Sequence, residues 1–279
     1  ASNSHLVRGP QYAPDYEFHE LGHGYLFVKY GGEQESTVNL LHVAVWNQKF
    51  GYSLDEAFRM SRGAANEHRT LDNTAVAWMT SFNFAPRKVP MAAGEKAYQL
   101  KGHAKYVDVA RLFGWEGLSD YWYSINEDYE AGDEWSKHGT PIDTITLRLS
   151  EKVGVDLRPL LHFWGTPPED PSALAAEIAA SSLPASSEIY DTLMHYQSLV
   201  PADNAAFQQF ALSWWGKQPS VDGYWTEREH ARQWDSTEHL DKWPEPIRPN
   251  GEMYTEAAAA ELRATVQEII DLYFPTGRP

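Results

Sequence analysis

The sequence of 279 residues contains no cysteine. The fold therefore has no disulfide bond, and any metal ion must be held by His, Asp or Glu, since no thiolate is present. No run of about 18 apolar residues occurs either, so we expect no membrane-spanning helix. These absences restrict a metal site to a few kinds of ligand.

Positive charge is scarce. Lys and Arg total 23 against 39 Asp and Glu, which gives a formal net charge of -16. Such a surface repels a phosphate backbone, and we find no basic cluster that offsets the repulsion. Nucleic acid and anionic membranes are therefore poor candidates as partners.

Apolar and aromatic residues are plentiful, at 42% and 13% of the chain. A chain of this length can bury a substantial core. We interpret most of the aromatic rings as core packing, and stacking on sugars is the alternative.

Periodicity and capping signals predict a mainly α fold with few strands. The expected helices cover residues 15–30, 33–50, a segment capped by Ser53 and Glu56, 65–82, 94–113, 118–130, 141–153, 157–164, 171–181, 186–198, 202–215, 226–235 and 252–274. The proline-rich stretch from Gly165 to Pro171 is the best internal boundary. We therefore predict a first domain over residues 1–166, and a helical C-terminal region over 167–279 that packs on it.

One motif points to metal chemistry, His19-Glu20-Leu21-Gly22-His23. In a helix, residues four apart share a face, so both imidazoles can bind one metal ion. Glu20 lies about 100° further round the helix, where it can act as general base on a water molecule at an open coordination position. The alternative is an ordinary amphipathic helix with two histidines.

A third protein ligand is expected shortly after the second histidine. Glu33 and Glu35 both follow the Gly31-Gly32 turn, and helical spacing favours Glu35, because it shares a face with Asn39, His42 and Trp46. Asn39 then lies one turn beyond the ligand, where it can hydrogen-bond a ligand imidazole.

This pattern resembles the enhancin-like, mucin-cleaving zinc metallopeptidases of the gluzincin type, in which a Glu ligand and an Asn–Leu pair follow the second histidine. The resemblance continues, in order, through Leu112-Phe-Gly-Trp115, Asn126-Glu-Asp-Tyr129, Ile142-Asp143, Leu147-Arg-Leu-Ser150, Val153-Gly154, Asp156-Leu157 and Phe163-Trp-Gly165. It implies Zn²⁺ as cofactor, a zincin-like helical catalytic subdomain, and cleavage of O-glycosylated proteins by secreted or cell-surface bacterial enzymes.

The expected reaction is direct attack of water on a peptide bond, with Glu20 as the base and with His19, His23 and Glu35 as the zinc ligands. A further donor is needed for the oxyanion, and His42, His103, Tyr129 and His138 are candidates that could equally be structural. Two other functions stay open: a glycoprotein-binding module with a vestigial zinc site, and another zinc hydrolase such as an aminopeptidase.

The resemblance also predicts a β-containing lobe before the metal helix. Only 18 residues precede His19, too few for such a lobe. Either the full-length protein continues on the N-terminal side with the strand that binds the substrate backbone, which we favour, or the substrate cleft is built differently.

Overall fold

The structure is a computed structural model that describes residues 15–24, 37–61, 69–81, 83–85, 88–91, 100–132, 141–215 and 254–279. Within these ranges every regular element is a helix and no strand occurs, so the prediction of a mainly α fold is confirmed. None of the helices described is long and apolar enough to cross a membrane.

The chain forms two compact units whose boundaries differ from the predicted ones. The first unit combines Ala1–Leu71 with Lys96–Thr140, and the second combines Asp72–Glu95 with Pro141–Pro279. The helices just before the proline-rich stretch, expected in the first domain, belong to the second unit. The reason is packing, because Phe163 stacks on Tyr196 with ring centroids 4.9 Å apart, and both side chains are fully buried.

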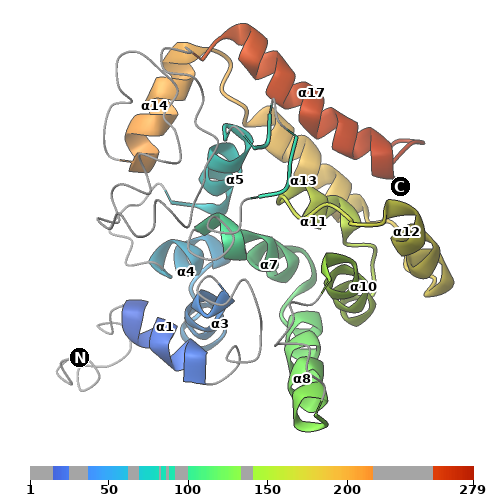
Figure 1. The fold of residues 1–279 in the computed structure, drawn as a ribbon. Helices are drawn as coiled ribbons and strands as arrows, with labels where there is room; N and C mark the ends of the chain where they lie inside the picture. Colours follow the sequence, from blue (N-terminus) through green and yellow to red (C-terminus); the bar gives the residue numbers. More distant parts are fainter. Residues whose placement is uncertain are drawn as a thin grey trace. The chain divides into compact units, whose positions relative to one another are not determined.

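The first unit contains five of the described helices (Figure 1): α1 (Asp15–Gly22), α3 (Asn39–Phe50), α4 (Leu54–Met60), α7 (Leu100–Phe113) and α8 (Glu116–Glu130). Helix α3 packs against α1, α4 and α7, and α7 also packs against α8. The capping box predicted before α4 is present: Ser53 Oγ accepts from the backbone of Glu56, and the Glu56 side chain accepts from the backbone of Ser53.

The second unit contains α5 (Leu71–Met79) from its second residue onward, and the helices that follow Thr140. These are α10 (Ile142–Val153), α11 (Arg158–Phe163), α12 (Pro171–Ala180), α13 (Ser187–Ser198), α14 (Asn204–Trp215) and α17 (Glu256–Tyr273). Helices α11, α13 and α17 pack against one another, and α10 packs against α11 and α12.

Several helix ends follow their local signals. Gly154 closes α10 in the left-handed region at φ +85°, and residue 141, where this helix was expected to begin, is the N-cap proline. The first helix was expected to reach residue 30; its α-helical part ends at Gly22, and residues 25–36 lie outside those described. The helix predicted at 226–235 also lies outside the described residues.

Gly165 occupies a position in the second unit that only glycine can fill. Its φ is +72°, and a Cβ atom there would lie 2.6 Å from Met91 Cβ and 2.7 Å from Trp78 Cζ2. The backbone N–H of Met91 donates to the Gly165 carbonyl at 2.9 Å, which holds the two segments together. The indole of Trp78 donates to the carbonyl of Phe163, so this turn also fixes the tryptophan ring.

Asp143 joins the start of α10 to the segment before α12. Its two carboxylate oxygens accept from the backbone N–H groups of Glu169 and Asp170, at 2.8 and 2.7 Å. We expect Asp143→Ala to lower the free energy of unfolding by about 1–2 kcal/mol, because both donors lose a charged acceptor. Urea unfolding followed by circular dichroism measures the change.

Glu169→Ala is the matched control. It removes one carboxylate from the same segment but keeps the backbone N–H that Asp143 binds. An equal loss of stability in both variants would show that charge, and not the pair of hydrogen bonds, is responsible.

Candidate metal centre

Helix α1 has a buried face, an exposed face and an edge between them. Phe18 and Gly22, four residues apart, are buried against α3, whereas Glu20 and Leu21 are exposed. His19 and His23 are half-buried and lie at the edge between these two faces. A metal ion held there would be fixed by the helix on one side and accessible from solvent on the other.

Gly22 allows α1 to approach α3 closely (Figure 1). A Cβ atom at this position would lie 2.6 Å from the carbonyl oxygen of Val38 and 2.7 Å from its Cβ. Val38 is fully buried and is the N-cap residue of α3. The absence of a side chain at Gly22 therefore sets the distance between the motif and the first residue of α3, Asn39.

The two motif histidines face each other. His19 Nε2 and His23 Nε2 lie 3.2 Å apart, with the ring planes at 81°. On its other side, the His19 ring donates from Nδ1 to Asn39 Oδ1 at 3.1 Å. With its proton on Nδ1, a neutral His19 presents a lone pair at Nε2, toward His23.

These atoms fit a zinc ion. Two nitrogens at about 2.0–2.1 Å from a tetrahedral zinc are about 3.3 Å apart, close to the distance between the two Nε2 atoms. A zinc-binding imidazole almost always donates its second ring N–H to an oxygen, as His19 does to Asn39. The predicted contact between Asn39 and a motif histidine is present, and Asn39 is buried; the metal that His19 would bind stays a prediction.

The remaining members of the predicted site are only partly described. Glu20 is exposed, next to His19, where solvent can reach its carboxylate. Glu35, and Glu33 as the alternative, lie outside the residues described, so the third ligand stays a prediction. Among the described residues, no group of three His, Cys, Asp or Glu side chains is close enough to hold a metal ion.

His42 is buried in the contact between α1 and α3 and does not face solvent. Its ring stacks on Phe18, with centroids 4.6 Å apart and planes at 12°, and only 3% of the residue is exposed. Neither ring nitrogen has a hydrogen-bond partner in the part of the chain that the structure describes. Burial lowers the pKa of His42 to about 4, so the ring is neutral at pH 7.

The other proposed oxyanion donors differ in their surroundings. His103 is fully buried, with its Nε2 3.2 Å from Ser61 Oγ and its ring packed on Phe58. These contacts favour a structural role for His103. Tyr129 lies near the C-terminal end of α8 with its side chain exposed. His138 lies outside the described residues.

Two features beside the motif were not predicted. The Phe18–His42 stack positions the turn of α1 that carries His19, and Glu17 is buried with one carboxylate oxygen unpartnered among the described groups. The close contact between Gly22 and Val38 was not predicted either. The glycine inside the motif was its available signal, because glycine weakens a helix unless it has a packing role.

No protein-family model matches the chain, and no curated protein or solved structure is significantly similar to it. The family resemblance therefore stays a prediction that depends on the motifs and on the geometry of this site.

We expect Gly22→Ala to lower the free energy of unfolding by about 1–3 kcal/mol, because the new Cβ must displace Val38. The same displacement moves His19 away from Asn39, so zinc affinity falls as well. Urea unfolding and a zinc titration measure the two effects.

Gly24→Ala is the control, since a Cβ atom there meets nothing within 4 Å. That variant changes stability by less than about 1 kcal/mol and leaves zinc affinity unchanged. If Gly22→Ala behaved like Gly24→Ala, the close contact would have no role in the site.

The buried neutral His42 makes stability depend on pH. Between its ordinary pKa of 6.5 and about 4, the unfolded chain binds a proton at His42 that the folded chain does not. The contribution of the neutral His42 ring to the free energy of unfolding is therefore fully present above pH 6.5 and is lost as the pH falls toward 4.

We expect His42→Phe to keep the stack on Phe18 and to remove this dependence. Unfolding is measured in chelator at pH 7 and at pH 5, and the variant gains stability relative to the wild type at the lower pH. A difference that is the same at both pH values would contradict the assignment of a neutral buried ring.

Proposed function

We propose that the first unit carries the zinc site of an endopeptidase that cleaves peptide bonds with water. His19, His23 and Glu35 would hold the metal, and Glu20 is the general base. The sequence resemblance supports O-glycosylated, mucin-type proteins as the substrate class, and a secreted or cell-surface location.

The observation that carries this proposal is the pair of facing imidazole nitrogens together with the Asn39 contact. The 3.2 Å between the two Nε2 atoms is close to the spacing of two nitrogen ligands on one zinc ion, which supports the proposal. The bond from His19 Nδ1 to Asn39 Oδ1 selects the tautomer whose Nε2 can bind metal. Both features support a metal ligand pair over two unrelated histidines on an amphipathic helix.

Glu20 on α1 and Asn39 on α3 have separate tasks in the proposed reaction. When bound, zinc supplies Lewis-acid activation of the substrate carbonyl and of a water molecule. Glu20, exposed beside His19, takes the proton of the attacking water and passes it to the departing amine. Asn39 keeps the His19 ring in one orientation throughout.

His42 is better suited to positioning than to donating a hydrogen bond to the oxyanion. A donor for that charge must face the reacting carbonyl. His42 instead lies in the contact between α1 and α3, with its ring face on Phe18 and both nitrogens buried. We therefore assign His42 to holding α1 in place.

Zinc binding is tested first, by elemental analysis and by competition with a chromophoric chelator. The wild type binds about one zinc ion per chain, His19→Ala binds none, and Asn39→Ala binds about 10–100-fold more weakly. His195→Ala is the control, because that exposed histidine pairs with Asp72 in the second unit. Unchanged zinc binding in His19→Ala would reject the site.

Hydrolysis is tested with a mucin-type glycoprotein before and after removal of its O-glycans. We expect Glu20→Gln to keep zinc but to lose at least about 100-fold in kcat/KM, because it cannot accept the proton. Glu127→Gln, an exposed glutamate on α8, is the control with unchanged activity. Cleavage of small aminoacyl amides but of neither glycoprotein would indicate another zinc hydrolase.

A glycoprotein-binding module with a vestigial site makes a different prediction. It binds the glycoprotein with equal affinity as wild type and as Glu20→Gln, and cleaves nothing in either form. Binding without cleavage by the zinc-loaded, full-length protein would favour this reading over the proposed peptidase.

A further inference from the structure

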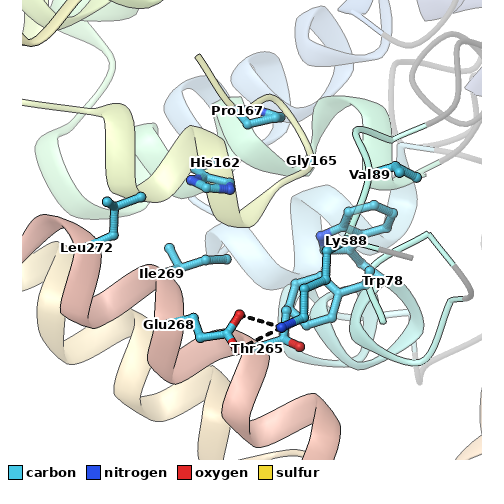
Figure 2. Close-up of a pocket in the computed structure, with 11 residues that line it drawn as sticks. Trp78, Lys88, Val89, His162, Gly165, Pro167, Thr265, Glu268, Ile269 and Leu272 are labelled. Carbon is cyan, nitrogen blue, oxygen red and sulfur yellow. Dashed lines mark hydrogen bonds and ion pairs between the residues drawn. The ribbon is translucent and has the colours of Figure 1, made fainter. Parts of the chain in front are cut away.

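The second unit contains a small pocket of about 210 Å³ between α17 and the turns that follow α5 and α11 (Figure 2). Trp78, Phe84 and Ile269 supply apolar walls, and all three are buried. Lys88, Glu268 and His162 are its charged or titratable side chains. No part of the proposed peptidase reaction uses this pocket.

One wall of the pocket is fixed before any ligand binds. The Trp78 indole donates to the Phe163 carbonyl, and its six-membered ring lies against the backbone of Gly165. Phe84 packs edge-on against Trp78, with ring centroids 5.6 Å apart. A wall whose rings cannot rotate loses little entropy when a ligand binds.

Two opposite charges meet at one side of the pocket. Lys88 Nζ lies 2.7 and 2.5 Å from the two carboxylate oxygens of Glu268 (Figure 2). The side chains are 45% and 59% exposed, and an ion pair with such exposure is weak and easily replaced. The backbone of Lys88 has φ +49°, a conformation that non-glycine residues rarely adopt and that carries strain.

The opposite side of the pocket carries no charge. His162 Nδ1 lies 3.1 Å from the hydroxyl of Tyr273, and burial lowers the pKa of His162 to about 4. At pH 7 the imidazole is therefore neutral. A ligand in this pocket meets one cation and one anion together on one side and uncharged groups elsewhere.

We propose that this pocket binds a free α-amino acid with an apolar side chain. The carboxylate of the ligand pairs with Lys88 and its ammonium group pairs with Glu268, so each protein charge exchanges one partner for another. The side chain lies between Trp78, Phe84 and Ile269, where its apolar surface leaves water.

The size of the pocket agrees with this class of ligand. A volume of 210 Å³ equals about seven water molecules at about 30 Å³ each. Sites for drug-sized molecules are larger, at about 300–1,000 Å³. A compact zwitterion of leucine size fits this volume.

The test is calorimetric titration of the full chain with L-leucine. We expect saturable binding with a Kd at or below about 1 mM. Glycine, which lacks the apolar side chain, and N-acetyl-L-leucine and L-leucinamide, which each lack one charge, bind at least about tenfold more weakly.

Variants assign the binding to the pocket. Lys88→Met and Glu268→Gln each weaken L-leucine binding at least about tenfold, because one charge of the ligand is left unpaired. Arg278→Met is the matched control, since Arg278 pairs with Asp191 in the same unit at 2.8 Å with similar exposure. Circular dichroism of each variant checks that the fold is retained.

Three results would overturn the proposal. They are no saturable binding of L-leucine up to about 10 mM, equal binding of the charge-blocked analogues, and unchanged affinity in both pocket variants. Loss of binding in His19→Ala would instead place leucine at the metal centre and would equally reject the pocket.

Discussion

The contact between Gly22 and Val38 is the constraint on which the candidate metal centre depends. Because Gly22 has no side chain, α1 comes within van der Waals distance of Val38, the N-cap residue of α3. Asn39, the next residue, then reaches His19, and His42 one turn further on reaches Phe18. A polar and an apolar contact thus fix the same turn of α1 from two sides, which gives the His19 ring one orientation.

Local signals in the sequence were sufficient for most of the helices and for part of the site. Ser53 and Glu56 form a capping box and Gly154 ends a helix because these effects involve only neighbouring residues. The contact between His19 and Asn39 could be predicted from helical spacing. His19 lies four residues before His23, and Asn39 lies four residues after Glu35. Glu35 lies outside the described residues, so its role as a third ligand stays a prediction from helical spacing alone.

The unit boundary could not be predicted because it depends on contacts between distant residues. A proline-rich stretch after Gly165 indicates a linker by composition. In the structure this stretch begins with a glycine packed against Trp78 and Met91, and it leads directly into α12. The buried rings of Phe163 and Tyr196, 33 positions apart, hold α11 to α13. Side-chain packing of this kind leaves no local signature in the sequence.

The motifs that carry the family resemblance divide into two kinds when their contacts are compared. His19, His23 and Asn39 make polar side-chain contacts at the motif itself. Asp143 and Gly165 instead hold turns of the second unit, through backbone hydrogen bonds and a close packing contact. Contacts of the second kind hold the fold together and say nothing about chemistry. The argument for a hydrolase therefore depends on α1 and the start of α3, and it is there that zinc affinity and catalysis must be measured.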